Sequence, residues 1–156
     1  MTSCVLVTGA DGQVGSALKK AALGQDHLIF LAKGELDITD PVAISQVFSE
    51  LSPSIVVNAA AFTNVDLAED SIDLVRSVNV TGPSLIAEHC AKHGASLIHL
   101  SSDYVLGGGS RPAIEDDLCN PVGVYAQSKL DAELRVRQEL DAHIILRSSW
   151  IFSGTH

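Results

Sequence analysis

The sequence has few cysteines, and they follow no recognisable pattern. Three occur in 156 residues, and Cys4, Cys90 and Cys119 fall respectively in a predicted strand, a predicted helix and a predicted loop. An odd number at irregular spacing argues against a disulfide framework and against a cysteine-based metal site. We therefore expect no metal and a reducing compartment, the cytoplasm.

Basic residues and long apolar runs are also scarce. Lysine and arginine number 10 against 19 aspartates and glutamates, a formal net charge of -9, and Lys19-Lys20 is the only adjacent basic pair. An acidic chain without a basic cluster repels nucleic-acid phosphates and anionic lipid. No apolar run reaches membrane-spanning length, and the N-terminus shows no export signal. We expect neither nucleic-acid nor membrane partners.

What the sequence contains instead is an alternation of short β-branched runs and longer amphipathic segments. This alternation is the signature of βαβ units around a parallel sheet. The strands, mostly continuous apolar runs as in sheets covered on both faces, are predicted over residues 4–8, 27–32, 54–58, 96–100 and 143–147. The helices are predicted over residues 13–23, 41–51, 65–77, 82–92 and 122–140. The fold class is therefore α/β, a doubly wound parallel sheet in one domain, residues 1–156.

Several predicted helix ends carry residues that start or stop helices. Asp40 and Thr81 are each followed closely by a proline, and we expect them to be the N-caps of the second and fourth helices. Gly24 and Gly94 stand where the first and fourth helices should stop. The one long irregular segment covers residues 101–121, and a loop of that length in a small domain is usually functional.

Three glycines lie at the first strand–helix corner. Gly9, Gly12 and Gly15 follow the first predicted strand and open the first predicted helix, the context that a dinucleotide-binding fingerprint requires. Glycine allows a sharp turn and the close approach of a phosphate, and the helix N-terminus offers unpaired N–H groups. A glycine corner without any ligand is the alternative. The P-loop pattern GxxxxGK[ST] is absent, which argues against nucleotide hydrolysis and favours NAD(P) on a Rossmann fold.

The end of the second strand bears on the choice of cofactor. An acidic residue about 20 positions past the glycines normally binds the free ribose of NAD, but the sequence there reads Leu31-Ala32-Lys33-Gly34-Glu35. Ala32 cannot accept a hydroxyl hydrogen bond, whereas Lys33 can pair with a 2′-phosphate. The pattern favours NADPH, with NADH as the alternative if Lys33 is only a solvated loop residue.

A tyrosine and a lysine share one face of the last predicted helix. Tyr125 and Lys129 stand four residues apart. A phenol with a pKa of about 10 is a weak acid–base group at neutral pH, but a neighbouring ammonium is expected to lower its pKa. Tyr125 can then protonate a carbonyl oxygen as hydride arrives. Such a pair also arises by chance, so by itself it is weak.

Serines at the end of the fourth strand strengthen this interpretation. Ser101-Ser102-Asp103 lie at the carboxyl end of that strand, where ligands bind in doubly wound sheets. A serine hydroxyl there can hydrogen-bond the same carbonyl oxygen. The alternative is that the two serines only end a strand and start a turn.

Together these motifs resemble the extended short-chain dehydrogenase/reductase family, in its dTDP-4-dehydrorhamnose reductase branch. The glycine and YxxxK motifs are common to the superfamily, whereas the Gly-Gln-Val, Asn-Ala-Ala-Ala and Ser-Asp-Tyr-Val segments point to this branch. The matching segments are Gly9–Gly15, Leu36–Asp40, Val57–Asp66, Ser101–Val105, Tyr125–Lys129 and Arg147–Trp150.

The resemblance implies an NAD(P)H-dependent reduction of the 4-keto group of a dTDP-deoxysugar. The implied cofactor contacts are Gly12, Gln13 and Val14 at the pyrophosphate, Asp37 and Ile38 at the adenine, and Ala61, Phe62 and Thr63 alongside. The implied catalytic residues are Ser102 in the Thr/Ser position of the family triad, Tyr125 as proton donor and Lys129 at the nicotinamide ribose. Tyr125 and Lys129 are implied cofactor contacts as well. The implied sugar-nucleotide contacts are Ser102, Asp103 and Trp150, although an aromatic that closes a strand explains Trp150 equally well.

Three departures from the family pattern affect these expectations. Ala32 and Lys33 replace the acidic strand end of some members, which bears on cofactor choice. Ala126 replaces a glycine that often follows the tyrosine, a change that a helix tolerates. The family's chain continues into a substrate domain that residues 1–156 lack, so we expect an incomplete sugar-nucleotide site.

Two other functions keep the same fold. A sugar-nucleotide epimerase or dehydratase uses the same tyrosine, lysine and serine positions, and a regulatory subunit binds the cofactor without catalysis. We expect a sugar nucleotide as the small-molecule partner. A homodimer is compatible with the sequence, which leaves the oligomeric state open.

Overall fold

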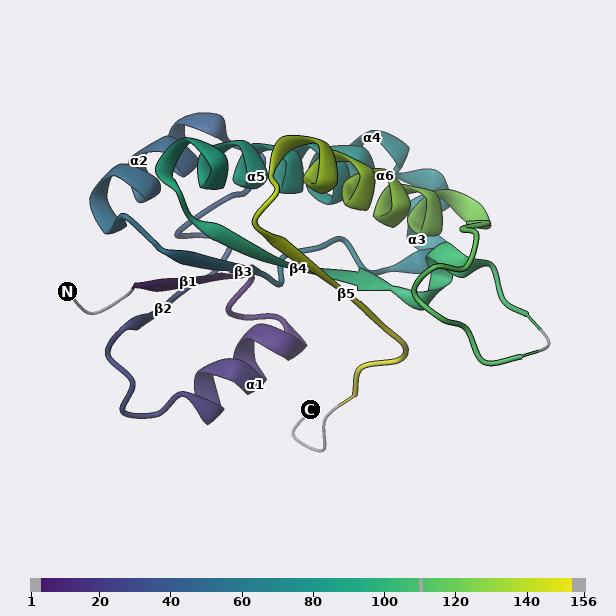
Figure 1. Ribbon diagram of the computed structural model, residues 1–156, viewed down its shortest axis with the longest axis horizontal. Helices are drawn as coiled ribbons and strands as arrows, with labels where there is room; N and C mark the ends of the chain where they lie inside the picture. The colour runs from purple at the N-terminus through teal and green to yellow at the C-terminus, as the bar shows by residue number, and fades with distance from the viewer. Residues whose placement is uncertain (1–3, 110, 153–156) are drawn as a thin grey trace.

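One parallel sheet organises the chain. The computed structural model describes residues 4–109 and 111–152, which contain five strands in the spatial order β2-β1-β3-β4-β5 (Figure 1). All neighbouring strands are parallel. The strands are β1 Val5–Thr8, β2 Leu28–Leu31, β3 Ile55–Asn58, β4 Ser96–Ser102 and β5 His143–Ser148. The predicted fold class, an α/β domain with a doubly wound parallel sheet, is confirmed.

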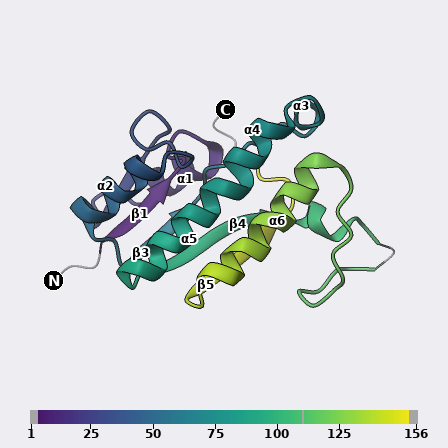
Figure 2. The same cartoon turned by 90° about the horizontal axis from the view of Figure 1, so that it is seen from above.

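The helices cover the two sheet faces unequally. They are α1 Gln13–Ala21, α2 Pro41–Leu51, α3 Val65–Asp70, α4 Ile72–Arg76, α5 Gly82–His93 and α6 Gly123–Glu139, with a π-helical turn η1 at Ser77–Thr81 and a 3-10 turn η2 at Asp103–Leu106. Figures 1 and 2 show α2, α5 and α6 side by side on one face and α1 on the other.

The uneven layering leaves one face of β5 open among the described residues. Ile145 packs on the core beneath the helices, whereas Ile144 and Leu146 point away from it and are 56% and 47% exposed. Successive side chains of a strand alternate between the two faces of a sheet. The expectation that every strand is covered on both faces therefore fails at β5, because α1 lies beneath the other end of the sheet.

Two predicted helix ends are confirmed. The side chain of Asp40 accepts hydrogen bonds from the backbone N–H of Val42 at 2.8 Å and of Ala43 at 3.2 Å, so it is the N-cap of α2. Gly94 ends α5 in the left-handed region, with φ at +69°. Glycine occupies this region without the steric penalty of a Cβ.

Other predicted boundaries are wrong. The first helix stops at Ala21, before Gly24, and the third is divided at Ser71, whose backbone leaves the helical region. Thr81 is not an N-cap, because its backbone is helical and α4 continues through the π turn into α5. The segment 101–121 is irregular only after η2, since β4 extends to Ser102.

The strand order creates a crevice at the carboxyl ends of β1 and β3. The chain adds β2 on one side of β1 and β3 on the other, and ligands bind at such a switch point in open α/β sheets. The glycine corner packs tightly there. Gly9 has φ at +68°, and a Cβ on it would lie 2.7 Å from the nitrogen of Ala60. A Cβ on Gly15 would lie 2.2 Å from the carbonyl oxygen of Gly9.

Three polar residues lie side by side in the middle of the sheet. Thr8, Asn58 and His99 are fully buried and occupy paired positions on β1, β3 and β4. The Thr8 hydroxyl donates to Asn58 Oδ1 at 2.6 Å, and Asn58 Nδ2 donates to His99 Nδ1 at 3.2 Å. The proton of a neutral imidazole is then on Nε2, which has no partner among the described residues. Burial, aided by the charge of Lys129, lowers the pKa of His99 to about 3.

The tight glycine corner predicts a large effect for one added methyl group. Gly15→Ala should lower the free energy of unfolding by about 1–3 kcal/mol, because overpacking against a backbone oxygen cannot be relieved by a rotamer change. Urea unfolding measures the change. Gly34→Ala is the matched control, because no atom lies within 4 Å of its added Cβ. Equal midpoints for the two variants would contradict the packing argument.

Burial of neutral His99 predicts a pH-dependent stability. The pKa is about 3 in the folded chain, against an ordinary value of 6.5, so only the unfolded chain binds this proton in between. The resulting stability is complete above pH 6.5 and is lost as pH falls toward 3. His99→Gln should reduce the slope of unfolding free energy against pH, between pH 6.5 and 5, by up to about 1.4 kcal/mol per unit. Urea unfolding at several pH values measures it, and an unchanged slope would refute the assignment.

Candidate active site

Most of the predicted site residues line two adjoining cavities at the switch point. The larger, of about 410 Å³, is lined by Gly12, Gln13, Val14, Ala61, Thr63, Ser102, Asp103, Tyr125, Lys129 and Trp150. The smaller, of about 300 Å³, is lined by Gly9, Gly12, Lys33, Asp37, Ile38, Ala61 and Phe62. Gly12 and Ala61 line both. Gly15 lines neither, because it packs inside the corner against Gly9.

Lys129 is a buried ammonium at the back of the larger cavity. Its side chain comes from α6, the residue is only 2% exposed, and Nζ donates to the carbonyl oxygen of Leu100 in β4 at 2.7 Å. Burial lowers the pKa of Lys129 to about 8, and the negative charge of Glu133 opposes this shift. A group with this pKa is mostly charged at neutral pH and loses its proton in mildly alkaline solution.

The pKa of Tyr125 departs from expectation. Burial raises it above 10, a hydrogen bond with Ser102 partly offsets this, and Asp103 and Tyr104 raise it further. The expected lowering by Lys129 is therefore wrong in this structure: the pKa shifts upward, burial of the phenol is the largest cause, and the ammonium is not among the causes. Tyr125 is a neutral phenol at neutral pH, the protonation state of a proton donor.

Ser102 has a structural contact as well as a place in the cavity. Its hydroxyl accepts from the backbone N–H of Tyr104 at 3.2 Å, which makes it the N-cap of η2, and donates to Asp103 Oδ1 at 3.2 Å. The other carboxylate oxygen of Asp103 accepts from the Ser149 hydroxyl at 2.7 Å. The two interpretations of Ser102, as a turn residue and as a cavity residue, are therefore compatible.

The end of β2 carries a carboxylate that the sequence analysis missed. Glu35 folds back so that its Oε2 accepts from the backbone N–H of Ala32 at 2.9 Å. Lys33 is exposed, and its Nζ lies 3.9 Å from Asp37 Oδ2. Hydrogen bonds from Thr39 chiefly hold the pKa of Asp37 below its usual range. Opposite charges therefore stand at this strand end, and Lys33 alone does not decide the choice of cofactor.

A buried asparagine was also missed. Asn79 lies in the π turn, is 1% exposed, and binds both backbone groups of Phe62, with Oδ1 accepting from N at 2.8 Å and Nδ2 donating to O at 3.0 Å. Nδ2 also donates to the Ser128 hydroxyl in α6 at 3.0 Å. Asn79 thereby joins the cavity wall at Phe62 to the helix that carries Tyr125. Its only sequence signal is a polar residue between two valines.

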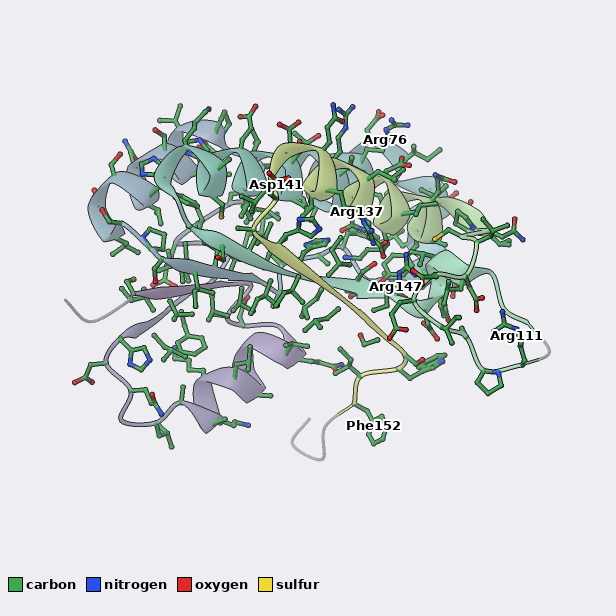
Figure 3. All side chains as sticks on the ribbon, in the orientation of Figure 1. Arg76, Arg111, Arg137, Asp141, Arg147 and Phe152 are labelled. Atoms are coloured by element: carbon green, nitrogen blue, oxygen red, sulfur yellow. The ribbon has the colours of Figure 1, made fainter. Side chains whose placement is uncertain are left out.

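A third and larger cavity shares Asp103 and Tyr104 of η2 with the cavity that Lys129 lines. It measures about 1150 Å³, and its lining includes Asp103, Arg111 and Arg147. Figure 3 shows Arg111 on the irregular segment and Arg147 beneath α6 near the end of β5. Arg147 donates to the carbonyl oxygen of Glu115 and to Cys119 Sγ, each at 3.3 Å. It therefore fixes this segment to the sheet.

Two features are absent from the described ranges, 4–109 and 111–152. No helix there is long and apolar enough to cross a membrane. No group of three or more His, Cys, Asp or Glu residues there is arranged to hold a metal ion.

Curated proteins similar to this chain include dTDP-4-dehydrorhamnose reductases of several bacteria. The dTDP-4-dehydrorhamnose reductase of Mycobacterium tuberculosis strain H37Rv is 40% identical over 157 residues, which cover 96% of this chain and 51% of that protein. This chain therefore spans about half the length of the relatives it matches.

Solved structures of dTDP-4-dehydrorhamnose reductases superpose closely on this chain. A dTDP-4-dehydrorhamnose reductase of Clostridium acetobutylicum superposes with a TM-score of 0.93 at 34% identity, over 97% of this chain and 55% of that one. The Bacillus anthracis enzyme, solved in complex with NADP, gives a TM-score of 0.91 at 34% identity over the same shares. A family model described as "RmlD substrate binding domain" matches residues 2–156. The chain therefore belongs to the RmlD branch of the extended short-chain dehydrogenase/reductase family.

Proposed function

We propose that residues 1–156 form the cofactor-binding domain of an NAD(P)H-dependent reductase that converts the 4-keto group of a dTDP-deoxysugar into an alcohol. The observation that carries this proposal is the shared cavity, in which Ser102, Tyr125 and Lys129 face the glycine corner. The similarity to dTDP-4-dehydrorhamnose reductases supports the choice of substrate class.

The glycine corner fits a dinucleotide pyrophosphate. Gly12 is the N-cap of α1 and supplies no side-chain cap, so the first N–H groups of that helix are open to an anion. A Cβ at Gly9 or Gly15 would collide with backbone, so only glycine permits this close corner. Gly12, Gln13 and Val14 would hold the pyrophosphate, Asp37 and Ile38 the adenine end, and Ala61, Phe62 and Thr63 the flank.

The protonation states support the catalytic roles that the resemblance implies. When bound, the cofactor supplies the hydride. Tyr125, a neutral phenol because burial raises its pKa, donates the proton to the substrate's carbonyl oxygen. The Ser102 hydroxyl would turn from Asp103 Oδ1 to donate its hydrogen bond to the same oxygen. The Lys129 ammonium stabilises the phenolate that Tyr125 becomes after proton transfer, and it binds the nicotinamide ribose. Asp103 and Trp150 contact the sugar nucleotide.

Compartment and assembly are part of the proposal. Cys4, Cys90 and Cys119 are all free thiols, which supports a reducing cytoplasm. A homodimer stays a prediction, to be checked by sedimentation of the intact protein. An epimerase or dehydratase and a non-catalytic regulatory subunit stay as the competing outcomes of the activity test below.

Cofactor choice is tested at Lys33. If its ammonium pairs with a 2′-phosphate, Lys33→Glu should weaken NADPH binding by roughly tenfold or more and leave NADH binding nearly unchanged. Isothermal titration calorimetry with both cofactors measures the ratio. Lys92→Glu is the matched control, since Lys92 is exposed on α5 and pairs with Glu88. An NADPH/NADH preference that survives Lys33→Glu would remove this role.

The reaction is tested at Tyr125. In the intact protein Tyr125→Phe should slow ketone reduction by about 100- to 10,000-fold and leave cofactor affinity nearly unchanged, because only the proton donor is removed. The assay follows formation of the C4 alcohol together with NAD(P)H consumption. Gln127→Ala, on the same helix but exposed, is the control.

The same assay separates the alternatives. Turnover of a sugar nucleotide without net NAD(P)H consumption would indicate an epimerase or dehydratase. Cofactor binding by the intact protein without any turnover would indicate a regulatory subunit. Full activity of Tyr125→Phe would refute its role as proton donor.

A further inference from the structure

A buried ion pair lies one helical turn beyond Lys129. Glu133 of α6 is 1% exposed, and its Oε1 accepts from the Ser101 hydroxyl of β4 at 2.6 Å. Arg147 of β5 donates to both carboxylate oxygens, from Nε to Oε1 at 2.9 Å and from Nη2 to Oε2 at 2.7 Å. A bidentate arginine fixes both the position and the plane of a carboxylate. Glu133 therefore joins α6 to β4 and β5.

Glu133 and Lys129 attach the same helix face to consecutive residues of one strand. Lys129 Nζ donates to the carbonyl oxygen of Leu100, and the carboxylate of Glu133 accepts from Ser101. Tyr125, Lys129 and Glu133 recur every four residues, so their side chains lie on one face of α6. These two adjacent contacts with β4 fix the position of α6, and with it the position of Tyr125 relative to the cavity.

Glu133 is also the buried negative charge nearest in sequence to this ammonium. Burial alone would raise the pKa of Glu133, but hydrogen bonds from Arg147 and Ser101 hold it below the usual range, so the carboxylate is ionised at neutral pH. Among the described residues, His99 of β4 and Tyr125 of α6, which are neutral, also lie near Lys129, and Asp103 and Tyr104 line the same cavity. Arg147 of β5 binds the Glu133 carboxylate, and Nη2 of the more exposed Arg137 of α6 lies 3.7 Å from Glu133 Oε2.

We propose that Glu133 is a positioning residue for the Tyr125–Lys129 pair: its carboxylate, fixed by Arg147 and Ser101, keeps the Lys129 amine protonated and held against β4. The proposal rests on the proposed function, in which Lys129 acts as a cation beside Tyr125. Neutralising Glu133 would leave the burial of Lys129 unopposed, so its proton would be lost at lower pH.

The test reads the protonation of Lys129 directly. The protein is labelled with carbon-13 at the lysine Cε, and the Lys129 signal, identified by its absence in Lys129→Met, is followed by NMR as pH is raised. Glu133→Gln alone would leave Arg147 buried without its partner, which is strongly destabilising. The double variant Glu133→Gln/Arg147→Gln removes both charges and leaves a neutral amide at each position. Its Lys129 midpoint should move down by about one pH unit, tenfold in acidity.

Two further variants separate charge from packing. Asp131→Asn removes one carboxylate charge two residues from Lys129 on the exposed side of α6, where this carboxylate binds Gln127. It should leave the Lys129 midpoint unchanged. Glu133→Asp keeps the negative charge, so its Lys129 midpoint should lie close to that of the unmodified protein. The proposal fails if the Lys129 midpoint of the double variant equals that of the unmodified protein. It also fails if Glu133→Asp shifts the Lys129 midpoint as far as the double variant does.

This titration needs neither substrate nor turnover, so its outcome is independent of the activity test at Tyr125. A second readout links the two. In the intact protein the alkaline limb of the pH profile of ketone reduction should move to lower pH in the double variant and stay in place in Asp131→Asn. A lower rate with an unmoved limb would indicate a merely structural ion pair and would overturn the proposal.

Discussion

An ammonium group buried away from water must be held by protein dipoles and charges, and in this chain that group is Lys129. Its nitrogen donates to the Leu100 carbonyl, and the ionised carboxylate of Glu133 opposes the loss of its proton. The same positive charge helps to keep His99 neutral in the middle of the sheet. Much of the polar structure between α6 and the sheet therefore serves to stabilise one buried cation.

The sheet order turns this buried cation into part of a site. The crevice opens where β1 and β3 end, and the glycine corner lies on one side of it. The longer strand β4 places Ser102 on the opposite side of the crevice. Helix α6, which packs over β4, contributes Tyr125 and Lys129. Asn79 ties the crevice wall at Phe62 to that helix. Groups from distant parts of the sequence are thereby held around one space.

The sequence predicted the regular elements well, because each depends on a local pattern. Apolar runs placed all five strands to within a residue or two, and Asp40 marked the start of α2. The break at Ser71 and the π turn were missed, because the π turn carries the contacts of Asn79 with Phe62 and Ser128, 17 and 49 residues away. Glu133 was missed for the same reason, since its partner Ser101 lies 32 residues away.

By itself the sequence determined the parallel α/β fold, the glycine corner and the family, because strand period, glycine spacing and motif order are properties of neighbouring residues. It also named the residues that meet in the cavity. Only the tertiary structure decided their charge states. It showed that burial raises the pKa of Tyr125 and lowers that of Lys129, and that Glu35 folds back on the end of β2. These outcomes depend on how much water each group loses and on which partners approach from other elements, and neither can be read from local sequence.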